Sequence, residues 1–258
     1  MKKIQEYQKR CFKEYNKDIG YPDKNVFLQG TPIQPLVPVQ TVTGKILVVG
    51  DYPTAKMATI DKIKNVPVSN SDGPLIDEIY YKGNQLHENL MAKDLQECMF
   101  DEIGIKYEDC WMTNLVKVYL FTAADVRKYK ELGKEVVQTR NKFTTYAKKS
   151  LKWLNEEIEI CNPELIITLG AGPAQHLIKT TKARSITLLD GLLRSYEVNG
   201  EKYPVISLPH PRILSRKKNK SWMKLFDKRI CDAAKESLTT LRASNGKEKQ
   251  VEVEAEAE

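Results

Sequence analysis

The sequence has few residues of the kinds that bind metals or form disulfides. It holds only three histidines, and its five cysteines are scattered without a C-x-x-C pair. An odd, dispersed set of cysteines predicts reduced thiols that are mostly buried rather than a disulfide framework. We therefore expect no cysteine- or histidine-based zinc site, no other metal and no cofactor.

Long apolar stretches are also missing. No run approaches the roughly 20 residues that a membrane-spanning helix needs. The residues after Met1 are mostly charged or polar, without the apolar core of a secretion signal. We therefore expect a cytoplasmic protein without a membrane anchor. A chain of 258 residues is long enough to bury a sizeable core without a metal or disulfide.

Charge is unevenly distributed along the chain. The whole sequence carries +7, whereas residues 247–258 contain two lysines and five glutamates, so residues 1–246 carry +10. A basic body with an acidic end favours a polyanionic partner, nucleic acid first and an anionic membrane surface second. A soluble protein that is merely basic is the alternative at this point.

Four short apolar runs predict buried parallel strands, at residues 45–50, 110–114, 165–170 and 204–208. Between these runs, apolar residues recur at helical spacing and predict helices, one of them with an apolar stripe over residues 143–158. Thr122 and Asp125 have the spacing of a capping box, and residues 198–201 predict a tight hairpin turn. The fold class is therefore α/β, a three-layer α/β/α sandwich with a four-stranded, mostly parallel sheet.

The predicted domain organisation is simple. Residues 1–243 form a single domain, in which a helix over residues 1–20 precedes an extended, proline-rich lead-in at residues 21–44. Residues 244–258 are expected to form an acidic, disordered tail.

Polar residues follow each predicted strand, and ligands of open α/β sheets bind beyond the carboxyl ends of the strands. Asp51 follows the first strand, where it either forms a turn or orients water and stabilises a cation. Asn114 ends the second strand, where it either caps a turn or contacts the edge of a base. His210, held between two prolines, follows the fourth. These side chains are expected to converge at one edge.

Two further segments suggest contact with nucleic acid. Gly170, Ala171 and Gly172 form a strand-to-helix turn whose N–H groups can hold a phosphate. After His210 comes a basic cluster interleaved with the apolar residues Ile213, Leu214 and Trp222. The basic cluster comprises Arg212, Arg216, Lys217, Lys218, Lys220 and Lys224. Its alternative is a solvated surface.

Taken in order, four blocks resemble the uracil-DNA glycosylase superfamily, particularly its bacterial and archaeal family 4. Residues 49–53 (VGDYP) are similar to that family's V-G-E-A-P, and residues 111–117 (WMTNLVK) to its Y-I-T-N-V-V-K. Residues 162–171 (NPELIITLGA) resemble R-P-x-V-I-V-A-L-G-A, and residues 210–214 (HPRIL) resemble H-P-S-x-L. The resemblance covers roughly residues 43–235.

This resemblance implies a monofunctional DNA glycosylase, with Asp51 and His210 as catalytic residues. Because a base cannot be attacked inside the stack, it would be flipped into a pocket. The base-binding residues implied are Gly50, Tyr52, Pro53, Thr54 and Asn114. Lys117, Gly170, Ala171, Gly172, Arg212, Ile213, Leu214, Arg216, Lys217 and Lys218 would contact DNA. We expect DNA as the partner and a monomeric protein.

The chain departs from the family at informative positions. Val118 and Ser150 stand where cysteines of the family's iron–sulfur cluster are expected, so we expect no cluster. Thr54 occupies the position of a tyrosine that excludes a C5 methyl group in the classical enzymes. Residues 55–90 lack the family's base-stacking phenylalanine, for which Tyr80, Tyr81 and His87 are candidates.

These departures predict excision of a C5-modified pyrimidine, including bulky bases of the kind found in phage DNA, in genome defence. A uracil-DNA glycosylase acting in base excision repair is one alternative, and a noncatalytic DNA-binding relative is another. A nucleotide-phosphate hydrolase is disfavoured because no metal-binding carboxylate cluster is evident.

Overall fold

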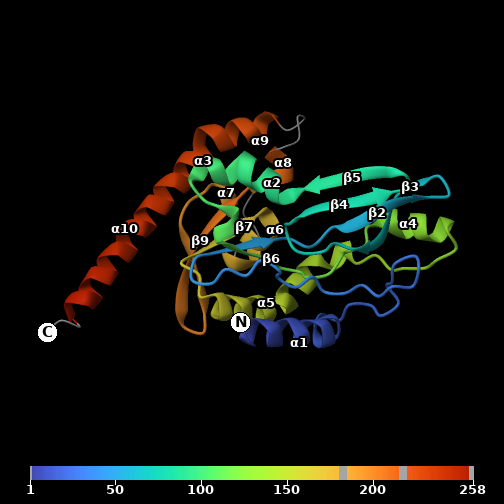
Figure 1. Cartoon of the computed structure of the whole chain (residues 1–258), viewed down its shortest axis with the longest axis horizontal. Helices are drawn as coiled ribbons and strands as arrows, with labels where there is room; N and C mark the ends of the chain where they lie inside the picture. The colour runs from blue at the N-terminus through green and yellow to red at the C-terminus, as the bar shows by residue number, and fades with distance from the viewer. Residues whose placement is uncertain (1, 180–184, 215–219, 256–258) are drawn as a thin grey trace.

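The computed structural model describes the backbone of residues 2–179, 185–214 and 220–255. Its central sheet has the order β6-β1-β7-β9-β8. The strands are β1 (Ile46–Gly50), β6 (Cys110–Asn114), β7 (Leu165–Leu169), β8 (Arg194–Val198) and β9 (Glu201–Leu208). β6, β1, β7 and β9 pair in parallel, and β8 pairs antiparallel to β9. The predicted α/β class is confirmed (Figure 1).

The strand number differs from the prediction. The sheet has five strands rather than four, because β8 adds to the edge as the first arm of a hairpin with β9. The predicted turn at residues 198–201 joins these two strands and is confirmed, with positive φ angles at Asn199 and Gly200. β8 alternates exposed and buried positions, as an edge strand does, and so lacks the continuous apolar run that marked the other four.

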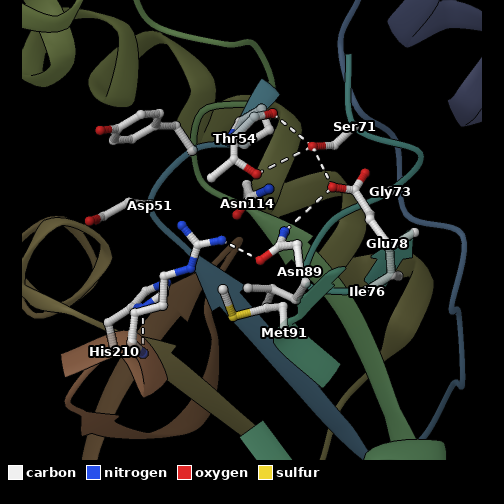
Figure 2. A pocket seen from close by; sticks show the side chains of 14 residues that line it. Asp51, Thr54, Ser71, Gly73, Ile76, Glu78, Asn89, Met91, Asn114 and His210 are labelled. Atoms are coloured by element: carbon white, nitrogen blue, oxygen red, sulfur yellow. Dashed lines mark hydrogen bonds between the residues drawn. The ribbon is translucent and has the colours of Figure 1, made fainter. Parts of the chain in front are cut away.

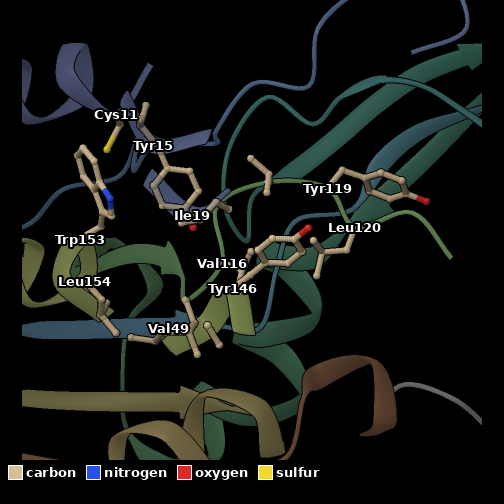
Figure 3. Packing of buried hydrophobic residues seen from close by; sticks show 14 of the residues in the cluster. Cys11, Tyr15, Ile19, Val49, Val116, Tyr119, Leu120, Tyr146, Trp153 and Leu154 are labelled. Carbon is tan, nitrogen blue, oxygen red and sulfur yellow. The ribbon is translucent and has the colours of Figure 1, made fainter. Parts of the chain in front are cut away.

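Helices cover both faces of the sheet (Figure 1). Alternate residues of each strand point to opposite faces. Leu47 and Val49 therefore join a core with α1 (Lys2–Ile19) and α5 (Phe143–Cys161), seen in Figure 3. Val48 faces the other core, which α2 (Met91–Leu95), α3 (Asp101–Ile103) and α10 (Cys231–Ala255) help to form.

The other α-helices of the described residues lie between the strands or follow β9. They are α4 (Ala123–Glu131), α6 (Ala171–Leu177), α7 (Ser185–Leu188), α8 (Pro211–Leu214) and α9 (Lys220–Leu225). The predicted capping box is confirmed at the start of α4, where Asp125 N–H donates to Thr122 Oγ1 and Thr122 N–H donates to the Asp125 carboxylate. α1 ends at Ile19, before the left-handed Gly20, as predicted.

Two β-hairpins occupy the segment between β1 and α2. They pair β2 (Ala55–Ile60) with β3 (Ile63–Asn70), and β4 (Asp77–Lys82) with β5 (Gln85–Leu90). Both extend to one side of the central sheet (Figure 1). This segment is the one for which the resemblance offered no counterpart, and it brings new side chains to the strand ends.

The C-terminal segment differs from the expected disordered tail, because α10 continues as a helix to Ala255. Lysine, glutamate, glutamine and alanine are abundant over residues 247–255. These residues favour helix by propensity, so a low-hydrophobicity composition did not by itself exclude a regular backbone here.

Candidate active site

A cavity of about 200 Å³ opens at the carboxyl ends of β1 and β6. Both predicted catalytic residues and all the predicted base-binding residues except Gly50 line it together with Arg212: Asp51, Tyr52, Pro53, Thr54, Asn114, His210 and Arg212. The convergence predicted from the strand ends is therefore confirmed. In Figure 2, Asp51 and His210 lie at one side of the cavity, with Asn114 between them and the opposite wall.

Asp51 is placed by the turn that follows β1. Its backbone carbonyl accepts a hydrogen bond from Val116 N–H (3.0 Å), which ties the turn to the end of β6. Its Oδ1 atom is buried and accepts no hydrogen bond within the described part of the chain. Burial raises the pKa of Asp51 to about 6, against the opposing charge of Arg140 and the N–H of Gly172. The site thus holds a poorly solvated carboxylate that is ionised near neutral pH.

Arg140 lies beside the site, and sequence reasoning missed it. Its guanidinium lies 4.5 Å from the ring centre of Tyr52 and 5.1 Å from that of Phe143. Stacking on two rings fixes a planar cation, and its charge favours the ionised form of Asp51. No local signal marks Arg140, because it reaches the site from a 3-10 turn that is distant in the sequence.

Asn114 is held over the end of the neighbouring strand. Gly50 and Asn114 are register partners in β1 and β6, and a Cβ atom at position 50 would lie 2.5 Å from Asn114 Oδ1. Because glycine has no Cβ atom, position 50 leaves room for the side-chain amide of Asn114. The residue is 3% exposed, yet its amide lines the cavity, where it offers one donor group and one acceptor group to a ligand.

His210 sits directly after β9, before α8. Its Nδ1 accepts a hydrogen bond from Arg212 N–H (3.2 Å). A neutral imidazole that accepts at Nδ1 carries its proton on Nε2. The Nε2–H group is therefore the donor that this side chain offers.

The Gly170–Gly172 turn packs against Asp51. A Cβ atom at position 172 would lie 1.9 Å from Asp51 Oδ1 and 2.9 Å from the ring of Phe143. Gly172 is therefore required sterically for Asp51 to keep its position. Contact of Gly170, Ala171 and Gly172 with a DNA phosphate stays a prediction.

Lys117 does not occupy the surface position that a DNA contact needs. It is fully buried and forms an ion pair with Glu157 at 2.6 Å. Its Nζ also donates to Thr113 Oγ1 (2.9 Å) and the carbonyl of Asn114 (3.3 Å). The prediction is corrected: Lys117 holds the end of β6 from the protein interior, because α5 supplies a buried carboxylate.

The segment after His210 is described only in part. Arg212 lines the cavity and donates to Asn89 Oδ1. Ile213 is half-buried, whereas Leu214 is 4% exposed and belongs to the core, so the predicted contact of Leu214 with DNA is corrected. Arg216, Lys217 and Lys218 lie outside the described residues.

Residues of the two hairpins complete the cavity wall, and sequence reasoning missed them as well. Ser71, Gly73, Glu78 and Asn89 all line the cavity. Alternation of polar and apolar residues predicts a strand, but it does not show that the polar face lines a binding site.

Within residues 2–179, 185–214 and 220–255, no group of three His, Cys, Asp or Glu side chains could hold a metal ion. None of the helices in these ranges is long and apolar enough to cross a membrane.

The iron–sulfur cluster of family 4 does not fit the two positions that the resemblance identifies. Val118 is buried in the apolar core. Ser150 Oγ lies 2.6 Å from the hydroxyl of Tyr15. Neither side chain supplies the thiolate that such a cluster needs.

Comparison with known proteins agrees with this geometry. The model of the uracil DNA glycosylase superfamily matches residues 39–234, which is more than half of the chain. None of the curated proteins matches the chain significantly. The matched range contains β1, both hairpins, β6, β7, β9 and every side chain that lines the cavity. The chain therefore belongs to the uracil DNA glycosylase superfamily, a membership that supports glycosylase activity on DNA.

Proposed function

We propose that this protein is a monofunctional DNA glycosylase that releases a flipped pyrimidine carrying a C5 substituent. The observation that carries the proposal is the meeting of a carboxylate, an amide and an imidazole in one cavity, from Asp51, Asn114 and His210. Such a set supplies the three groups that glycosidic hydrolysis of a nucleotide needs: a carboxylate for the sugar, an amide for the base and a donor for the leaving group.

Each side chain has a distinct part in the proposed reaction. The Asn114 amide donates to and accepts from the edge of the flipped base. The ionised Asp51 carboxylate orients water and stabilises the positive charge that develops on the sugar. As the C–N bond breaks, negative charge moves onto the base, and His210 Nε2–H donates to the base oxygen.

The proposed reaction is simple hydrolysis rather than a lyase reaction. A lyase step through a Schiff base requires an accessible lysine at the sugar. Among the described residues that line the cavity none is a lysine, and Lys117 is buried against Glu157. These facts support water as the nucleophile.

The preference for a C5-substituted base is supported by the small side chain at position 54. Thr54 stands where the resemblance places an excluding tyrosine, and it lines the cavity. Two other side chains could fill that space and restore a preference for uracil: Tyr52, which lines the cavity, and Tyr81, which is 75% exposed. We propose genome defence against DNA with modified pyrimidines as the biological role, with repair of uracil in DNA as the alternative.

Base release from synthetic DNA tests the proposal. Single- and double-stranded oligonucleotides carrying uracil or a C5-substituted pyrimidine are incubated with the protein, and mass spectrometry identifies the freed base. We expect faster release of a C5-substituted base than of uracil. Rapid release of uracil with the substituted bases untouched would contradict the substrate preference and support the repair enzyme.

Two variants separate catalysis from DNA binding. Asp51→Asn and His210→Ala should each lower base release by about 10²- to 10⁴-fold, while binding to DNA is retained. Asp23→Asn, at an exposed position outside the cavity, is the matched control and should leave release unchanged. Release at the wild-type rate by both cavity variants would place the chemistry elsewhere. Binding of DNA by the unmodified protein without release of any base would favour the noncatalytic relative.

A further inference from the structure

One wall of the cavity is a continuous chain of hydrogen-bonded polar side chains. It faces the side on which Asp51 and His210 lie (Figure 2). Ser71 follows β3, Glu78 belongs to β4, and Asn89 belongs to β5, so the two hairpins build this wall. We call Thr54, Ser71, Glu78 and Asn89 the polar wall. The proposed function uses the small size of Thr54, but it assigns no part to Ser71, Glu78 or Asn89.

Glu78 is the centre of the polar wall. It is 4% exposed, and its carboxylate accepts from Asp72 N–H (2.7 Å), from Ser71 Oγ (3.2 Å) and from Asn89 Nδ2 (3.4 Å). All three donors are neutral. A buried carboxylate is costly unless donors satisfy it, and it has about four lone-pair sites. It therefore favours a further hydrogen-bond donor and repels an anionic group, while Arg212, which donates to the neighbouring Asn89 Oδ1, disfavours a second cation.

The other members add both donors and acceptors. Ser71 Oγ has one hydrogen, which points to the carbonyl of Thr54 (2.8 Å) or to Glu78 (3.2 Å), and it lies 3.3 Å from Thr54 Oγ1. Asn89 Oδ1 accepts from Arg212, while within the described residues its Nδ2 donates only to Glu78. An amide nitrogen has two hydrogens, so one donor remains for a ligand. The wall thus offers donors and acceptors side by side.

This mixture matches a hydroxyl group, which donates and accepts at one atom. An alkyl group of the same size would desolvate the wall and return no hydrogen bond, so it binds less well. We infer that the polar wall is a specificity site for a neutral, hydroxyl-bearing substituent on the base. The inference rests on the proposed function, because it assigns the chemistry of the C5 substituent.

Two matched bases isolate the hydroxyl group. 5-Hydroxymethyluracil and 5-ethyluracil differ by a hydroxyl in place of a methyl group and are nearly equal in size. The first measurement is release of each base by the full-length protein, with uracil alongside. The second is competition between the two duplexes for binding to Asp51→Asn, which holds the base without releasing it.

We expect the hydroxymethyl base to be preferred at least about tenfold over the ethyl base, in kcat/KM and in binding, because a site built for a hydroxyl rejects its apolar analogue. In Asn89→Leu this ratio should fall toward one, because the wall loses the donor that the hydroxyl group meets. Glu88→Gln is the matched control, since Glu88 is exposed on the same strand and outside the cavity; it should keep the ratio. Thermal unfolding verifies that each variant folds.

The two proposals fail in different ways. Equal release and equal binding of the two bases, or a preference unaffected by Asn89→Leu, would overturn the inference while leaving the glycosylase proposal standing. Failure to release any of the three bases would overturn the glycosylase activity on these substrates. The binding ratio would then decide the inference by itself, because recognition of the hydroxyl precedes bond cleavage.

Discussion

Replacement of Asp51 by asparagine should stabilise the protein while lowering base release by about 10²- to 10⁴-fold. Burial raises the pKa of Asp51 from an ordinary value of 3.8 to about 6, so the folded protein binds this proton more tightly than the unfolded chain does. Ionisation of Asp51 therefore costs stability. This cost is absent below pH 3.8, grows as the pH rises and is complete above pH 6.

The magnitude follows from the difference of roughly two pH units between the pKa of Asp51 in the folded protein and its ordinary value. At about 1.4 kcal/mol per unit, the ionised carboxylate lowers the free energy of unfolding by about 3 kcal/mol at pH 7.5 and by about 1 kcal/mol at pH 4.5. Asparagine has nearly the same shape and cannot ionise. Asp51→Asn should consequently exceed the wild type by about these amounts at the two pH values.

Urea unfolding followed by circular dichroism at pH 7.5 and 4.5 measures both differences. Asp23→Asn, at an exposed position, is the control and should match the wild type at both pH values. A variant that is no more stable than the wild type at pH 7.5, or whose advantage grows as the pH falls, would refute the account of Asp51 as a buried carboxylate lacking solvation.

Four further predictions concern the surroundings of this site. Arg140→Gln removes the charge that favours ionised Asp51, so the acid limb of the kcat/KM profile should move to higher pH, whereas Arg140→Lys should move it less; an unchanged limb in both would contradict this role. Gly172→Ala places a methyl group 1.9 Å from Asp51 Oδ1 and should lower base release by at least about 10²-fold, measured beside circular dichroism to verify the fold. Lys117→Met leaves Glu157 buried without its cation and should cost about 3–5 kcal/mol of unfolding free energy, much of it recovered when Glu157→Leu is added. Finally, log K for DNA should fall with log[salt] at a slope near −4 if four residues of the basic cluster contact phosphates (roughly 0.9 per contact), and a flat response would remove that cluster from the interface.

The four parallel strands could be predicted because their signal is local. Each is a short, continuous apolar run that a sheet covered on both faces requires, and the parallel pairing of β6, β1, β7 and β9 followed as expected. Once parallel strands are assumed, their carboxyl ends lie at one edge. That geometry alone brings Asp51, Asn114 and His210 into the same cavity, although they are up to 159 positions apart.

The errors arose where a side chain's surroundings come from distant segments. Lys117 is a lysine at a strand end, and only the packing of α5 against the sheet brings Glu157 to it at 2.6 Å. Leu214 follows a histidine in a basic segment, yet α8 turns it into the core. Burial depends on which elements pack together, and neither charge nor local spacing specifies that.

The sequence by itself determined the α/β class, the strand ends and the three side chains that converge there. Tertiary structure alone decided what surrounds them: the guanidinium of Arg140 stacked on Tyr52, the backbone of Gly172 against Asp51, and the polar wall carried in by two hairpins. The physical reason is that hydrophobic periodicity depends only on residues that are close together in the sequence. The solvation and charge of a buried group, by contrast, are set by atoms that only the folded chain brings within a few ångströms.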